Sequence, residues 1–155
     1  MSAALHRFAA APTRLDPATG IFTGYASLFG IPDAQNDVVE RGAFAASLLR
    51  RGTGGIRMLW QHDPAEPIGT WLSLAEDPVG LRVTGRLVTA TARGREALDL
   101  LAAGAVDGLS IGFKAVRAER RRRDGPRRLL EVDLWEVSLV TFPALAGARV
   151  TRVAA

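Results

Sequence analysis

Three side chains of this sequence could together perform acyl transfer. They are a histidine, a serine and a glutamate, His62, Ser110 and Glu136, and each lies in a short motif within a stretch typical of a buried β-strand. A nucleophile, a base and a carboxylate that orients the base form a serine hydrolase site, which is recognised by these roles rather than by chain order. The three residues therefore predict a small serine protease.

Glu136 has two competing interpretations. It is in phase with the apolar residues of its predicted strand, so its carboxylate would be buried and would need a partner. The partner could be His62, whose tautomer the carboxylate would then fix, or an arginine such as Arg82 or Arg86 in an ion pair. Asp63 is a rival partner for His62, but neighbouring strand residues point to opposite faces. We rank Glu136 above Asp63, and both interpretations of Glu136 stay open.

His62 and Ser110 are weak signals when each is taken alone. His62 ends an apolar strand directly before Asp63-Pro64, which places it at a strand-to-loop junction where a side chain can reach a cleft. Gly108 and Gly112 flank Ser110 and would let a substrate backbone approach closely. The alternation of a strand continues after Ser110, unlike the strand-to-helix elbow of α/β-hydrolases, and this disfavours that fold.

The elements that position these residues follow from periodicity and turn signals. Strands are expected at about 5–10, 20–30, 56–62, 68–76, 81–88, 109–118 and 129–142. Helices are expected at 42–51, with Phe44, Ala45, Leu48 and Leu49 at helical spacing and Gly52 as its end, and at 91–103, with Gly104 as its C-terminal stop. Most of the strands are joined by hairpins. The pattern predicts a mostly β fold with peripheral helices, namely a closed antiparallel β-barrel of about seven strands.

Composition restricts the chemistry further. The 155 residues suggest a single domain, 1–155, with its core at about 5–148. The chain has no cysteine and two histidines, so disulfides and thiol catalysis are excluded and we expect neither a metal site nor a cofactor. No apolar run is long enough to span a bilayer, so we expect no membrane association and a soluble, intracellular protein.

The formal charge of +4 owes much to one arginine cluster, at 120–123 with Arg127 and Arg128. The cluster surrounds Asp124-Gly125-Pro126, which is a turn signal, so a solvated hairpin tip is the first interpretation. Docking of an acidic partner or of nucleic acid is the second. A nucleic-acid-binding barrel thus remains an alternative, although nucleic acid is not the expected partner.

A further signal comes from the order of several short motifs along the chain. They are Gly24-Tyr25-Ala26 with Phe29, Gly42-Ala43-Phe44, Leu59-Trp60-Gln61-His62-Asp63 with Pro67-Ile68-Gly69, Gly108-Leu109-Ser110-Ile111-Gly112-Phe113, and Glu136-Val137-Ser138-Leu139-Val140-Thr141 with Pro143-Ala144. In this order and spacing, over about residues 20–148, the set resembles the prohead (capsid-maturation) serine proteases of tailed phages and gene transfer agents.

The resemblance implies an assemblin-like β-barrel serine endopeptidase that cleaves the major capsid protein or its scaffold segment during prohead maturation. The histidine of the family falls on His62, its serine on Ser110 and its acidic third member on Glu136. Such an enzyme would act inside the immature capsid, in the cytoplasm of a bacterial host, and dimerisation is common among its relatives. The alternative is an inactive barrel that serves as an assembly factor.

Two finer expectations concern the neighbourhood of these residues. Backbone N–H groups at 144–147, just past the strand of Glu136, are candidates for the oxyanion donors, whereas Pro143 has no N–H to donate. Ser110 is the proposed nucleophile, so Ser110→Ala is expected to abolish processing. Ser138→Ala is expected to retain most activity.

Overall fold

The computed structural model describes residues 15–151, and the strand expected near 5–10 lies outside this range. The described elements follow in the order β1 (Ile21–Leu28), β2 (Asp37–Val39), α2 (Ala45–Arg51), β3 (Arg57–Trp60), β4 (Asp63–Glu76), β5 (Gly80–Leu87), α3 (Ala92–Ala103), β6 (Gly108–Glu119) and β7 (Arg127–Val140). The expected strands from residue 20 onward and both helices are therefore present. The short β2 was not predicted, because three residues carry no readable periodicity.

The strands form one sheet in the order β1-β5-β4-β3-β7-β2, and β6 also pairs with β7. Antiparallel ladders join β4 to β5 and β6 to β7, as the predicted hairpins require. The ladders of β2 and β3 with β7 are parallel, so the prediction of a purely antiparallel sheet is wrong. The 14-residue β7 is long enough to pair with β2 and β3 along one edge and with β6 along the other.

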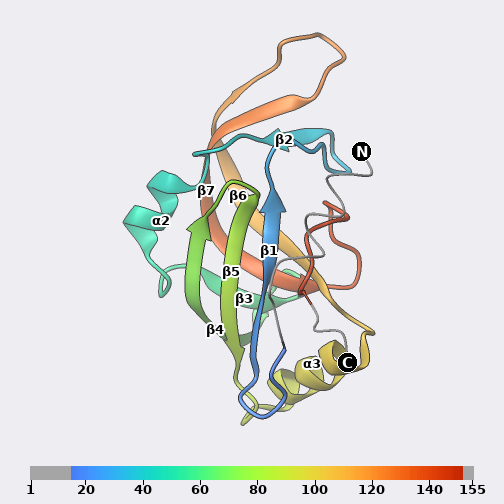
Figure 1. Cartoon of the computed structure of the whole chain (residues 1–155). Helices are drawn as coiled ribbons and strands as arrows, with labels where there is room; N and C mark the ends of the chain where they lie inside the picture. Colours follow the sequence, from blue (N-terminus) through green and yellow to red (C-terminus); the bar gives the residue numbers. More distant parts are fainter. Residues whose placement is uncertain (1–14, 152–155) are drawn as a thin grey trace.

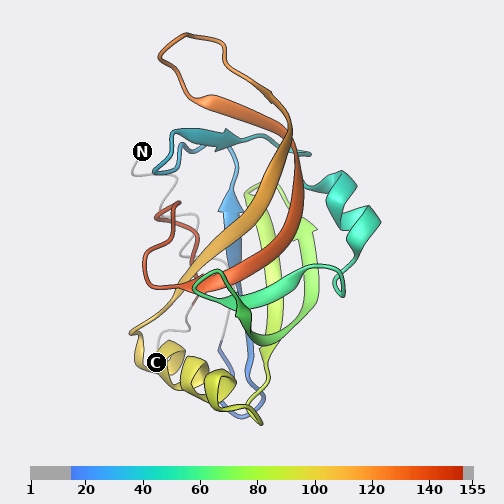
Figure 2. The ribbon, with the colours of Figure 1, turned by 180° about the vertical axis from the view of Figure 1, so that it is seen from behind.

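The sheet does not close into the predicted barrel but forms an open half-barrel (Figures 1 and 2). Closure would need a ladder between β1 and β6, and the segment 148–151 lies between these strands instead. Its backbone bonds are Tyr25 N–H to Arg149 O at 3.3 Å, Thr151 N–H to Thr23 O at 3.1 Å, Leu109 N–H to Ala148 O at 2.8 Å and Val150 N–H to Asp107 O at 2.8 Å. The segment uses the hydrogen-bonding groups that direct pairing of β1 with β6 would require.

The two helices begin and end close to the predicted residues. Thr91 caps α3, accepting a hydrogen bond from the Gly94 N–H at 3.0 Å, and Gly104 ends the helix in the left-handed conformation with φ 80°. In α2 the apolar residues predicted at helical spacing do not all face the sheet, because Leu49 is 90% exposed. The buried Ser47 donates to Val132 O on β7 and accepts from the Leu134 N–H, and this contact turns Leu49, two residues further, away from the sheet.

One hydrophobic cluster packs the strands and α3 together. Its largest fully buried side chains include Phe22, Phe44, Met58, Ile68, Leu101, Leu109, Leu134 and Leu139. Beyond this core the β6–β7 hairpin projects past the rest of the sheet (Figures 1 and 2). Among residues 15–151, no helix has the length and apolar character needed to cross a membrane.

Candidate active site

His62 lies in a tight turn directly after β3. Gln61 and His62 both adopt left-handed backbone conformations, with φ of 53° and 61°. The predicted strand–loop junction is therefore present, but β3 ends at Trp60 and the turn, not strand alternation, sets the direction of the imidazole. The Gln61 N–H donates to Leu139 O at 2.9 Å, so the turn is anchored to β7.

Ser110 and Glu136 lie on the paired strands β6 and β7. In this antiparallel ladder Ser110 is opposite Ser138, and Gly112 is opposite Glu136. Residues directly opposite one another project from the same face of a sheet, so the hydroxyl and the carboxylate share a face. Because β3 also pairs with β7, the same region of β7 brings His62 alongside.

The carboxylate of Glu136 is buried and binds two groups. Its Oε1 is in hydrogen-bond contact with His62 Nδ1, and its Oε2 accepts a hydrogen bond from Ser138 Oγ at 2.6 Å. Arg82 and Arg86, the alternative partners, lie on β5, which is separated from β7 by β4 and β3. Of the two interpretations of Glu136, the structure has the contact with His62.

The rival carboxylate Asp63 is engaged locally. Its Oδ1 accepts the Ala65 N–H at 2.9 Å, at the exposed start of β4. Glu136, which we ranked above Asp63, is the carboxylate in contact with His62, but His62 lies in a turn and not in the strand assumed for that ranking.

Gly112 makes room for the carboxylate. A Cβ added at this position would lie 2.3 Å from Glu136 Oε1 and 2.6 Å from its Cγ, closer than such atoms can approach. Close approach of backbone and substrate is the expectation at Gly108 and Gly112, and at Gly112 the structure has the Glu136 side chain in the space that a Cβ would occupy.

The contact with Glu136 changes the acidity of His62. The hydrogen bond from the imidazole to the carboxylate raises the pKa of His62 above 6.5, partial burial opposes this rise, and the attraction between opposite charges adds to it. A carboxylate accepts hydrogen bonds, so Nδ1 carries the proton in the neutral ring. The other nitrogen, Nε2, is left as the proton acceptor.

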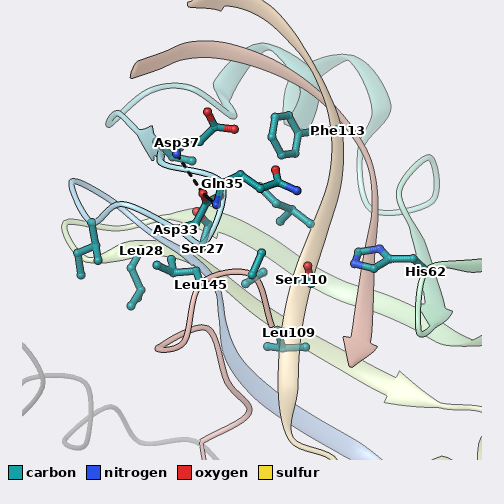
Figure 3. Close-up of a pocket in the computed structure, with 15 residues that line it drawn as sticks. Ser27, Leu28, Asp33, Gln35, Asp37, His62, Leu109, Ser110, Phe113 and Leu145 are labelled. Carbon is teal, nitrogen blue, oxygen red and sulfur yellow. Dashed lines mark hydrogen bonds between the residues drawn. The ribbon is translucent and has the colours of Figure 1, made fainter. Parts of the chain in front are cut away.

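Ser110 and His62 line the same cavity, of about 160 Å³ (Figure 3). In this view Ser110 lies on β6 between the His62 ring on one side and Ser27 and Leu145 on the other. A second depression continues past His62 along β6 and is bordered by Phe113 and Trp135. Together they make a groove, and Ser110 and His62 both lie along it.

The loop before β2 forms a wall of the cavity that was not predicted from the sequence. Asp33 accepts the Gln35 N–H at 2.8 Å and the Asp37 N–H at 3.0 Å, and Asp37 accepts from two of the three guanidinium nitrogens of Arg127, each at 2.8 Å. The residues Pro32, Asp33 and Asn36 are local signs of this turn, but its position against β6 depends on the parallel pairing of β2 with β7.

The arginine cluster is divided by the structure. Arg127 forms an ion pair with Asp37, and Arg128 forms one with Glu40. These two arginines therefore connect β7 with β2 and the residue that follows it. The four arginines at 120–123 lie at the exposed tip of the β6–β7 hairpin, where Arg120 donates to Gly125 O at 2.8 Å. The first interpretation, a solvated hairpin tip, fits this location.

Comparison with known sequences gives a family and two curated relatives. The family model described as caudovirus prohead serine protease matches residues 10–155. The prohead protease of Enterobacteria phage HK97 is 35% identical over 131 residues, which cover 83% of this chain and 58% of that protein. The capsid polyprotein of Pseudomonas phage PAJU2 is 34% identical over 145 residues, covering 90% of this chain and 21% of the polyprotein. The chain thus spans only part of the length of both.

Comparison with solved structures concerns the fold. The bacteriophage T4 capsid assembly protease superposes with a TM-score of 0.62 at 11% identity, over 77% of this chain and 80% of that one. The KSHV protease in complex with a hexapeptide phosphonate inhibitor gives 0.54 at 16% identity, over 84% and 63%. The varicella-zoster virus protease gives 0.52 at 15% identity, over 84% and 62%. These similarities support the assemblin-like architecture.

Proposed function

The chain belongs to the caudovirus prohead serine protease family, and on that premise we propose that it is a serine endopeptidase that cleaves capsid or scaffold protein segments during prohead maturation. The observation that carries this proposal is the contact of His62 with the buried Glu136, together with the cavity that His62 and Ser110 both line. A nucleophile, a base and a carboxylate that orients it are the parts required for acyl transfer.

In the proposed first half-reaction, Ser110 Oγ attacks the carbonyl carbon of the scissile peptide bond. His62 Nε2 takes the hydroxyl proton and then gives it to the departing amine, so an acyl-enzyme forms and the amine product leaves. Glu136 holds the Nδ1 side of the ring and stabilises the imidazolium that exists between these two proton transfers.

In the second half-reaction, water attacks the acyl carbon while His62 Nε2 accepts its proton. The bond from the acyl carbon to Ser110 Oγ then breaks, His62 returns the proton to Ser110 Oγ, and the carboxylic product is released. Both tetrahedral intermediates carry an oxyanion that needs hydrogen-bond donors. Ala144 and Leu145 line the cavity together with Ser110, which supports the expectation that backbone N–H groups of 144–147 supply these donors.

The substrate proposal comes from the relatives. One is named a prohead protease, and another is a capsid polyprotein whose matched segment corresponds to 90% of this chain. We therefore assign this chain a capsid protein or its scaffold segment as substrate, inside the immature capsid in a bacterial cytoplasm, with a homodimer as the candidate active form.

Mass spectrometry of a capsid protein co-expressed with this chain tests the proposal. We expect a defined cleavage with the native chain, none with Ser110→Ala, and covalent labelling of Ser110 by a peptidyl phosphonate. Chelators should leave cleavage unchanged. Cleavage that persists in Ser110→Ala would refute the serine mechanism. A folded native chain that neither cleaves nor is labelled would favour the inactive assembly factor.

A further inference from the structure

Ser138 occupies the centre of the three strands that carry the proposed site. It lies on β7, opposite Ser110 on β6 and opposite Leu59 on β3, and it is fully buried. Its hydroxyl is therefore closer to the site than its separation from Ser110 in sequence suggests. The proposed mechanism gives this hydroxyl no task.

The Ser138 hydroxyl forms two hydrogen bonds. It donates to Glu136 Oε2 at 2.6 Å and accepts the backbone N–H of His62 at 3.0 Å. A hydroxyl has one proton to donate and lone pairs that accept, so the two bonds are compatible. One oxygen atom thus connects the carboxylate with the backbone of the residue whose ring that carboxylate orients.

The backbone that Ser138 holds is an unfavourable one. Residues other than glycine rarely adopt positive φ, and here Gln61 and His62 do so in succession. Such a turn persists only where its surroundings fix it. Two further bonds hold the turn besides the one to Ser138. The backbone N–H of Gln61 donates to Leu139 O at 2.9 Å, and the side-chain amide of Gln61 donates to Thr141 Oγ1 at 2.7 Å. The turn is clamped to β7, and Ser138 is the part of the clamp that also contacts Glu136.

We propose that Ser138 is a positioning residue that fixes the Glu136 carboxylate and the His62 turn relative to each other. The inference rests on the proposed function, because it assigns Ser138 a role in that same site. It replaces the expectation that Ser138→Ala retains most activity. Without the hydroxyl, Glu136 Oε2 loses its donor, the His62 N–H loses its acceptor, and the imidazole is no longer held in line with the carboxylate.

The chain offers a closely matched control in Ser47. Ser47 is also fully buried, and its hydroxyl also donates once, to Val132 O, and accepts one backbone N–H, from Leu134. It lies on α2 and lines neither the cavity of Ser110 nor the second depression that continues it. Ser47→Ala therefore removes an equivalent pair of hydrogen bonds away from the proposed site.

The experiment compares native protein, Ser138→Ala and Ser47→Ala by two readouts. The first is the rate constant for labelling of Ser110 by a peptidyl phosphonate. We expect Ser138→Ala to lower it roughly 10- to 100-fold, the factor that corresponds to the loss of one hydrogen bond to a charged group, and Ser47→Ala to leave it unchanged. The second is the downfield ¹H NMR signal of the His62 Nδ1 proton. It should move upfield in Ser138→Ala alone.

Ser138→Cys is a second variant in case Ser138→Ala does not fold. A thiol is similar in size but a weak donor and a weak acceptor, and the chain has no cysteine of its own. A folded Ser138 variant with the native labelling rate and an unmoved Nδ1 signal would overturn the proposal. If the native protein is not labelled at all, the proposed function fails, whereas the NMR comparison still tests Ser138.

Discussion

Glu136 joins its neighbours through both carboxylate oxygens, one to His62 and one to Ser138. A buried carboxylate is costly to desolvate, and these two contacts offset that cost with no arginine among its hydrogen-bond partners within residues 15–151. The raised pKa of His62 is the counterpart of this arrangement, because the carboxylate stabilises the protonated ring. The contact between His62 and Glu136 therefore contributes both to the stability of the fold and to the proposed chemistry. A substitution that keeps the hydrogen bond but removes the charge separates these two contributions.

Glu136→Gln should lower the rate of cleavage roughly 10²- to 10⁴-fold, the usual contribution of general acid–base catalysis. The amide keeps the shape and can still accept from His62, but it lacks the charge that stabilises the imidazolium. Melting temperature should change little. The test is cleavage of the capsid substrate alongside thermal unfolding, with Glu131→Gln on the same strand as control. A destabilised Glu136→Gln protein whose folded fraction cuts at the native rate would remove Glu136 from the mechanism.

The reaction should be lost as pH falls through the raised pKa of His62. Only the neutral imidazole accepts the Ser110 proton, so the rate should increase with pH, with a midpoint above 6.5. Phosphonate labelling measured against pH gives this midpoint without any need for the natural substrate. In Glu136→Gln the midpoint should move down, because the cause of the raised pKa is removed. A flat profile between about pH 5 and 8 would argue against His62 as base.

At the scale of elements, β7 organises the site. It pairs with β6 along one edge and with β3 along the other. Ser110 on β6 and His62 just after β3 are far apart in sequence, and this pairing places them on either side of Ser138. The glycine opposite Glu136 is part of this arrangement. The ladder leaves the carboxylate space only because Gly112 has no side chain.

Gly112→Ala should therefore behave as a site mutation rather than a simple strand mutation. Its Cβ would lie 2.3 Å from Glu136 Oε1 and would force the carboxylate away from His62. We expect cleavage and phosphonate labelling to fall about as far as in Glu136→Gln, and the His62 pKa to fall toward 6.5. Gly54→Ala is the control, since a Cβ there meets no atom within 4 Å. Native labelling in folded Gly112→Ala would show that the carboxylate can be displaced without consequence.

At the scale of the whole molecule, the open sheet leaves space for the cavity. Direct pairing of β1 with β6 along their length would bring together the strands whose residues now line opposite walls of it, such as Ser27 and Ser110. The segment 148–151 fills the gap directly beside the cavity, where it bonds Tyr25 on β1 and Leu109, the neighbour of Ser110, on β6. The half-barrel is thus joined next to the proposed site, and the cavity lies where Ser27 and Ser110 continue past this segment.

Gly24→Ala should release the segment 148–151 from β1. The new Cβ would lie 2.4 Å from Arg149 O and 2.9 Å from Val150 Cα, and these are backbone atoms that cannot move singly. We expect a loss of about 1–3 kcal/mol in unfolding free energy, as is typical of overpacking. Amide hydrogen exchange should accelerate at Val150 and Thr151. Gly54→Ala should change neither the unfolding free energy nor the exchange of these amides. Protection retained at both amides in Gly24→Ala would contradict the attachment of the segment 148–151 to β1.

The sequence by itself determined the features that depend on local physics. Thr91 and Gly104 set the ends of α3 through capping and a left-handed stop, and alternation set the long strands of the two hairpins. The residue types and the order of the motifs indicated His62, Ser110 and Glu136 and the family to which the chain belongs. Capping, alternation and turn chemistry involve residues close together in the chain, and they can therefore be inferred from the sequence alone.

Only the tertiary structure decided how distant segments combine. The parallel pairing of β2 and β3 with β7, the open edge between β1 and β6, and the exposure of Leu49 all depend on contacts between residues far apart in sequence. The same holds for Ser138, which is an unremarkable strand serine until the turn at His62 packs against it. Strand periodicity determines on which face of a strand a residue lies. The free energy of packing among all the strands determines which other residues that face contacts.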